Sequence, residues 1–222
     1  MDEIIDILMG CTSLVEQMDA VQSEQDAQNA MLSCFALRAE TKAWYGRFEL
    51  IHGTPLYTIT PDTTNILQAG FPNPVFPDRF EFAAIEVAEG HMLYWAALLI
   101  IYSLLHGTEL QKEFFRPGSC SKGQVAMFQE GAEFYANQIC RSVAYFIQPH
   151  MHILGGHNLL FPVSMASQFF HRSGLPDQYQ WCQEVFASLE SSGLGLASVL
   201  QGTPWSRYKE GEAAEPVVEI VE

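Results

Sequence analysis

Positive charge is scarce in this chain. Only 11 of its 222 residues are Lys or Arg, against 26 Asp or Glu, which gives a formal net charge of −15. Binding to nucleic acid depends largely on cationic residues that displace counterions from the phosphates. Anionic membrane surfaces attract the same residues. The composition therefore predicts a protein that binds neither DNA nor an anionic lipid surface directly.

Closely spaced cysteines are also absent. The chain has five cysteines, an odd number, and no two of them stand in a CxxC pair. Structural zinc sites normally use such pairs. Cys34, Cys140 and Cys182 lie among apolar residues, which is typical of small buried side chains in a reducing compartment. We therefore expect no metal, and we expect an intracellular location, nuclear or cytoplasmic.

The chain lacks an apolar run of membrane-spanning length and a secretory leader. Its first residues, MDEIIDILMG, carry acids where a leader needs positive charge. The longest apolar run, 92–105, is shorter than the ~20 residues that cross a bilayer. A helix surrounded by other helices is also apolar on all sides. We interpret this run as a buried core helix and expect no membrane association.

Helical periodicity dominates the rest of the sequence, and strand alternation is nearly absent. The pattern predicts an all-α fold, an irregular multi-helix bundle of about seven helices with two long central ones. The long helices are expected at 79–105, ended by Gly107, and at 124–148, ended by Pro149. The other segments are expected as a helix at 4–18 interrupted near Gly10, a helix at 23–48, a long loop at 52–78 with one helical turn near 65–69, and short helices near 159–171, 178–189 and 194–201.

Three regions follow from this reading. Residues 1–24 form a helical lead-in, and residues 25–201 form one helical domain large enough to bury a core, because 48% of the chain is apolar. Residues 202–222 are rich in acids and small side chains, so we expect a disordered acidic tail.

Within 25–201, loose motifs recur in a characteristic order. They are Leu37–Arg38 with Trp44, the run Met92–Ala96, Ala136, Ile139–Ser142, Tyr145, a break at Gly155–Gly156, Pro162, Ala166, Trp181–Cys182 and Gly193. This layout resembles the C-terminal helical regulatory region, the fungal-specific transcription factor domain, of fungal binuclear zinc-cluster transcription factors. The six-cysteine DNA-binding cluster of that family has no counterpart in the first 24 residues.

The resemblance implies a stand-alone regulatory module that senses a ligand or dimerises and has no DNA binding of its own. Its partners would be a small apolar metabolite, a partner regulator protein or a second copy. The alternative is a cofactor-independent enzyme, such as a cyclase, isomerase or dehydratase of fungal secondary metabolism, that uses an apolar pocket between helices. No GxSxG elbow, P-loop or GxGxxG motif after a strand is present, so no cofactor is expected.

Five polar residues interrupt the apolar stretches of the two long helices and are the candidate site. We expect Tyr94, Arg141 and Tyr145 to bind the ligand, with Arg141 and Tyr145 at its acidic or carbonyl end. In an enzyme, His91 or Tyr135 would carry the proton. Arg141 has a second interpretation as a structural residue, because a buried guanidinium needs a carboxylate partner. The partners considered for it are Glu86, Glu89 and Glu133.

A cluster of histidines marks the segment after the second long helix. His150, His152 and His157 could hold zinc or copper if the chain folded back on itself. No carboxylate partner or HExxH motif lies nearby in the sequence. We therefore expect these side chains to cap helix carbonyls or face solvent at a polar corner.

Overall fold

The computed structural model describes residues 2–62, 74–118 and 121–202, apart from the side chains of 111–114, 152 and 202. In these ranges it contains seven α-helices, a short 3-10 helix (η1) and a two-stranded sheet. Helices account for 79% of the structure. The predicted all-α fold is therefore confirmed. The predicted tail at 202–222 lies almost wholly outside the described residues.

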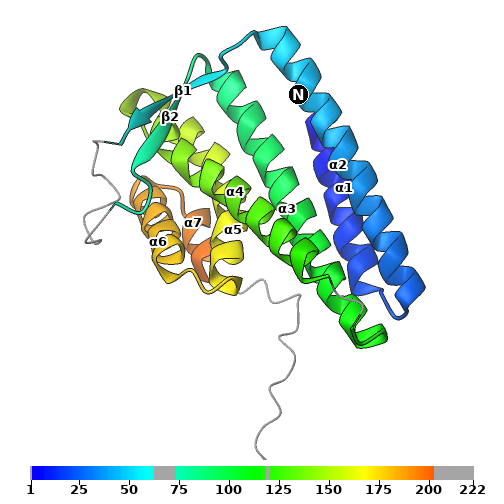
Figure 1. Ribbon diagram of the computed structural model, residues 1–222. Coiled ribbons are helices and arrows are strands. Elements are labelled where there is room, and N and C mark those ends of the chain that lie inside the picture. Colours follow the sequence, from blue (N-terminus) through cyan, green and yellow to red (C-terminus); the bar gives the residue numbers. More distant parts are fainter. Residues whose placement is uncertain (1, 63–73, 119–120, 203–222) are drawn as a thin grey trace, which may run out of the picture.

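Helices α1 (Asp2–Asp19) and α2 (Glu24–His52) form a hairpin along one side of the molecule (Figure 1). Ser23 caps α2, because its hydroxyl accepts a hydrogen bond from the Asp26 backbone N–H. The expected interruption at Gly10 is wrong. A Cβ at that position would lie 3.1 Å from Leu37 Cδ1, so Gly10 lets the two helices approach each other closely.

A β-hairpin follows α2, where the sequence predicted a loop and the start of a long helix. Strand β1 (Tyr57–Pro61) pairs antiparallel with β2 (Asp78–Phe82), and Ile59 lies opposite Phe80. Phe80 and Phe82 are buried and alternate with half-buried Arg79 and Glu81. This period-2 pattern is the strand signal that the helical prediction overlooked. The helical turn expected near 65–69 lies outside the described residues.

Helix α3 (Ile85–Phe115) runs through the middle of the molecule, between the α1–α2 hairpin and the remaining helices (Figure 1). It starts later and ends later than the predicted 79–105. Gly107 does not end it, because the next turn is held inside the protein: Thr108 is buried, and its hydroxyl donates to the Leu104 carbonyl at 2.8 Å.

By length and composition alone, residues Ile85–Leu110 of α3 would suffice to cross a membrane. However, 78% of the most apolar window of this segment is buried inside the domain. Its residues from Met92 to Leu105 are nearly all buried or half-buried against other helices. The interpretation of this run as a core helix is confirmed.

Helix α4 (Lys122–Phe146) packs along α3. The two approach closely at Gly131, where an added Cβ would lie 2.3 Å from the Tyr102 ring. The hairpin strand β2 covers the C-terminal part of α4. The pair α3–α4 is thus the long central pair that the sequence predicted, although α2, with 29 residues, is a third helix of similar length.

The C-terminal third folds as a second helical layer against α4. It consists of η1 (Pro149–Met151), α5 (His152–Arg172), α6 (Pro176–Ser191) and α7 (Leu196–Gly202). The predicted break at Gly155–Gly156 is wrong, because both glycines lie inside α5. An added Cβ at Gly155 would lie 2.0 Å from the Phe146 carbonyl oxygen, and one at Gly156 would lie 2.3 Å from Leu194 Cδ1.

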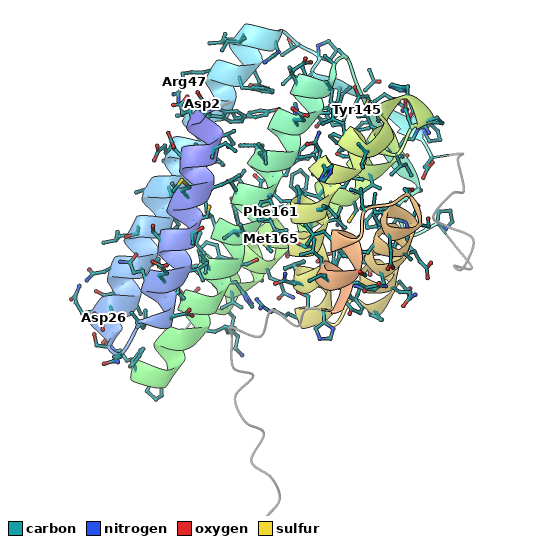
Figure 2. All side chains as sticks on the ribbon, turned by 180° about the vertical axis from the view of Figure 1, so that it is seen from behind. Asp2, Asp26, Arg47, Tyr145, Phe161 and Met165 are labelled. Carbon is teal, nitrogen blue, oxygen red and sulfur yellow. The ribbon has the colours of Figure 1, made fainter. Side chains whose placement is uncertain are left out.

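The core extends without interruption through these layers, and Figure 2 shows the side chains that fill it. Trp44, Trp95 and Trp181 are 5%, 4% and 3% exposed. The cysteines of the described residues (Cys11, Cys34, Cys140 and Cys182) are buried and unpaired, as expected for three of them, and Cys120 lies outside the description.

Candidate functional site

His91 lies at the centre of an aromatic cluster and has no exposed surface. Its Nδ1–H donates to the Val87 carbonyl at 2.8 Å, so the neutral ring leaves Nε2 to accept the Tyr45 hydroxyl at 3.2 Å. The rings of Tyr45, Phe48, Tyr57, Phe82 and Trp95 surround it. Burial lowers the pKa of His91 to about 4, so the ring is neutral near pH 7.

A line of tyrosines continues from His91 across α3 to α4. The Tyr45 and Tyr94 rings stack with centroids 4.2 Å apart, and Tyr94 meets the edge of Tyr135 at 6.3 Å. Burial raises the pKa of Tyr135 to about 12 and raises those of Tyr45 and Tyr94 as well. All three phenols stay protonated at neutral pH. The structure thus joins predicted residues His91, Tyr94 and Tyr135, with Tyr45 as the link that the sequence analysis missed.

Arg141 and Tyr145 lie on the same helix but outside this line. The Arg141 guanidinium sits over the Phe80 ring, 4.4 Å from its centroid, and its Nη2 is 3.6 Å from Asp78 Oδ2. The carboxylates considered for it, Glu86, Glu89 and Glu133, are not the partner in this ion pair. The reason is the β-hairpin, which brings Asp78 beside α4 from a segment that the sequence analysis assigned to the loop.

Tyr145 is 7% exposed and meets the edge of Phe82, with the ring centroids 5.2 Å apart. Phe82 also contacts His91, so this phenylalanine lies between Tyr145 and the aromatic cluster around the histidine. Burial raises the pKa of Tyr145. The five predicted site residues therefore do not line one chamber.

A hollow of about 10 Å³ lies beside Arg141, lined also by Arg79, Asp78 and Trp181. This is close to the smallest volume that holds one water molecule. Two buried donors on its lining residues, Arg79 Nε and Trp181 Nε1, have no hydrogen-bond partner among the described residues. The hollow has room for one water molecule, whereas a metabolite would not fit.

A much larger hollow, of about 490 Å³, lies at the α4–α5 connection and shares the lining residue Ile147 with the small one. We call it the C-terminal hollow. Volumes of about 300–1,000 Å³ are typical of small-molecule sites. Its lining comes from the end of α4, η1, the start of α5, the end of α6 and the turn before α7, and consists of Phe146, Ile147, Gln148, Pro149, Ile153, Gly156, Ser188, Leu189, Ser192 and Leu194.

The electrostatics of the C-terminal hollow favour a hydrogen-bond donor or a cation. None of the lining residues is charged. Helices α4 and α6 end at it, while α5 and α7 begin at it, so the helix dipoles largely offset one another there and the charge of the whole chain decides the preference. The whole chain carries a net charge of −15. The site can therefore hold an apolar body with a donor group, and its described lining residues include no acid or base.

The glycine pair shapes this hollow. Gly156 is one of its lining residues, and Leu194 packs against the bare Cα of that glycine. A side chain at Gly156 would fill the space between α5 and the turn before α7. The glycine pair Gly155–Gly156 therefore marked this site in the sequence, although we predicted from it a break in the helix.

The segment with the three histidines, predicted as a polar corner, forms η1 and the start of α5. His150 lies in η1 and His157 in α5, and both are exposed, while the side chain of His152 lies outside the described residues. In the part of the chain that the structure describes, no group of three His, Cys, Asp or Glu side chains is arranged to hold a metal ion.

Comparison with known proteins gives no further assignment. No family model, no curated protein and no solved structure matches this chain.

Proposed function

We propose that this chain is a non-enzymatic regulatory module that senses a small, mainly apolar molecule bound in the C-terminal hollow. The single observation that carries the proposal is the lining of that hollow. It has the volume of a ligand site, apolar walls from Phe146, Ile153 and Leu194, and only neutral polar groups at its edge. The resemblance to the regulatory region of fungal zinc-cluster factors favours the same class of function.

The ligand that best fits is an apolar molecule with an ammonium, hydroxyl or amide end. Its body would contact the aliphatic walls, and its donor would face the neutral polar groups at the edge of the hollow. Gln148 and Ser192, which line the hollow, add neutral hydrogen-bonding groups. A nuclear or cytoplasmic location, as expected from the free cysteines, belongs to this proposal.

The enzyme alternative has less support. The residues expected to carry a proton, His91 and Tyr135, do not line the C-terminal hollow. His91 has no exposed surface that a substrate could reach. A general acid or base must come within about 3 Å of the group it protonates or deprotonates.

The test uses Nile red, a neutral apolar dye, with the full chain and two matched variants. Ile153 is 58% exposed and lines the hollow, whereas Leu50 is 87% exposed on α2. We expect Ile153→Asp to weaken dye binding at least ~5-fold, because a carboxylate in an apolar wall must be desolvated by the dye. Leu50→Asp should leave it unchanged. Equal binding by both variants, or equal loss in both, would contradict the proposal.

A pair of competitors tests the preference for a donor. Octylammonium and octanoate have the same alkyl body and opposite charges. We expect octylammonium to displace Nile red from the wild-type chain at a lower concentration than octanoate does. Ile153→Ser weakens the apolar wall without adding a charge, so the difference should shrink in that variant if it arises at the hollow. A difference that persists there would show attraction to the general negative surface instead.

A further inference from the structure

Two cysteines from different helices meet inside the core. Cys140 lies on α4 and Cys182 on α6, and their Sγ atoms are 3.9 Å apart in a weak hydrogen bond. Both thiols are free, and they are 2% and 0% exposed. A disulfide bond is about 2.05 Å long, so each sulfur has to move by about 1 Å to form one.

The hollow of about 10 Å³ beside Arg141, which we call the small hollow, gives this pair access to small polar molecules. Cys140 is one of its lining residues, and Cys182 is not. Two further lining residues carry the unpartnered buried donors Arg79 Nε and Trp181 Nε1. Buried donors of this kind are normally satisfied by an oxygen atom that accepts a hydrogen bond. The small hollow is therefore suited to a molecule of about the size of water that carries such an oxygen.

The size of the small hollow selects among the oxidants that convert thiols to disulfides. Hydrogen peroxide, two joined oxygens with two hydrogens, is the one closest to water in size, and its oxygens accept hydrogen bonds. Oxidised glutathione consists of two joined tripeptides and is far too large for a space of about 10 Å³. Peroxide is therefore the oxidant that can reach Cys140 in the folded protein.

We propose that Cys140 and Cys182 form a peroxide-responsive dithiol site, in which Cys140 is oxidised first and Cys182 then closes a disulfide bond. The Cys140 thiolate attacks one oxygen of hydrogen peroxide, so that an S–O bond forms and the O–O bond breaks. The hydroxide that leaves takes up the proton released by the thiol, and Cys140 becomes a sulfenic acid.

The Cys182 thiolate then attacks the Cys140 sulfur. The S–S bond forms, the S–O bond breaks, and the hydroxide leaves as water with the proton from Cys182. Together the two sulfurs lose two electrons, and one peroxide is reduced to two waters. Neither cysteine lines the C-terminal hollow, so the dithiol site is independent of the proposed function.

Burial sets the rate of this reaction. It raises the pKa of Cys140 well above that of an exposed thiol, and the contact with Cys182 raises it further. Because the thiolate is the reactive form, the pair reacts slowly at neutral pH, and its rate should still rise about 10-fold between pH 8 and 9. An exposed thiol with a pKa of about 8.5 gains only about 3-fold over the same interval. A gain of that smaller size would overturn the assignment of the reaction to the buried pair.

The products of oxidation test the roles of the two cysteines. The folded full chain is treated with hydrogen peroxide, quenched in denaturant with iodoacetamide or dimedone, and mapped by peptide mass spectrometry. We expect the wild type to lose two hydrogens and to give one peptide pair joined through Cys140 and Cys182. Cys182→Ser should instead accumulate a sulfenic acid at Cys140, which dimedone traps. Cys140→Ser should give neither product, and Cys34→Ser, at another buried thiol, should react as the wild type does.

The wild-type map is decisive even if a serine variant fails to fold. Oxidation of Cys11 and Cys34 as fast as Cys140 would overturn the proposal, because it would show that peroxide enters by opening of the whole fold. A bond from Cys140 or Cys182 to a different cysteine would also overturn it. So would the absence of the Cys140–Cys182 bond at pH 9 under conditions that oxidise the thiols of the urea-unfolded chain.

A bulkier peroxide tests the role of the small hollow. tert-Butyl hydroperoxide has the same O–O group with a large substituent. We expect the folded chain to favour hydrogen peroxide over this reagent at least ~10-fold more strongly than the unfolded chain does, because the packed core excludes the substituent. Equal preference in the folded and unfolded chains would show that the small hollow does not admit the oxidant, and would overturn the proposal.

Discussion

The Tyr45 hydroxyl donates a hydrogen bond to Nε2 of His91 across 3.2 Å, joining α2 to α3 inside the aromatic cluster. Because Nδ1–H already donates to the Val87 carbonyl, His91 is held as a neutral ring with both nitrogens satisfied. Protonation of Nε2 would remove the acceptor that Tyr45 uses and would place a charge among aromatic rings. The pair therefore couples the packing of α2 on α3 to pH.

The first prediction is a loss of stability in mild acid. The pKa of His91 is lowered to about 4, below the value of about 6.5 in an unfolded chain. The unfolded chain therefore binds a proton first as pH falls. The contribution of His91 to stability is complete above pH ~6.5 and is lost progressively between pH ~6.5 and ~4. In denaturant unfolding between pH ~6.5 and ~4, we expect the free energy of unfolding to fall less steeply with pH for His91→Gln than for the wild type.

Comparing the two proteins at each pH removes the contributions of the carboxylates, which are common to both. Parallel stability curves for wild type and His91→Gln would show that His91 titrates normally in the folded protein.

The second prediction concerns the central tryptophan. Trp95 is 4% exposed and contacts Tyr57, Phe80 and His91. Replacing it with Ala should lower the free energy of unfolding by about 3–5 kcal/mol, because the surrounding rings cannot fill the cavity. Leu50→Ala, at an 87% exposed position, should change it by less than about 0.5 kcal/mol. A loss below about 1 kcal/mol for Trp95→Ala would mean that the aromatic cluster is not packed as described.

The third prediction separates the two interpretations of Arg141. Its side chain is 21% exposed, and its partner Asp78 is 48% exposed, so the ion pair itself is weak. With the contact to the Phe80 ring, we expect Arg141→Met to cost about 1–2 kcal/mol of stability. Nile red binding should not change, because Arg141 does not line the C-terminal hollow. Weakened dye binding by a stably folded Arg141→Met protein would show that Arg141 contacts the ligand, as the sequence predicted.

The fourth prediction compares glycines inside helices. Gly155→Ala would place a Cβ 2.0 Å from a backbone oxygen of Phe146, and Gly156→Ala would place one 2.3 Å from the movable end of Leu194. We expect both to destabilise, Gly155→Ala by about 3 kcal/mol and Gly156→Ala by about 1–2 kcal/mol, because overpacking moves neighbours. Gly46→Ala, in mid-helix with nothing within 4 Å, should stabilise by about 0.5–1 kcal/mol.

Thermal unfolding of these three variants gives the order directly. A stabilising Gly155→Ala would contradict the close packing of α5 on the end of α4 at Phe146.

The sequence by itself determined the fold class, the core and much of the helix order. Periodic apolar positions identified each of the helices of the described chain to within a few residues in most cases, because burial of one face repeats every three or four residues. The same pattern predicted the burial of Trp44, Trp95 and Trp181. These properties depend on local sequence or on overall composition, so they can be predicted from the amino-acid sequence alone.

Tertiary structure alone decided the β-hairpin, the partner of Arg141 and the location of the C-terminal hollow. The alternation at Phe80 and Phe82 is too short to predict a strand next to the strong helical pattern that follows it. Pairing with Tyr57–Pro61 is what makes this segment a strand. In the sequence, Gly155 and Gly156 indicate the end of a helix. In the structure they lie inside α5, where Phe146 and Leu194 leave no space for a side chain. Contacts between segments far apart in the chain leave no periodic signal, and for that reason only the folded structure reveals them.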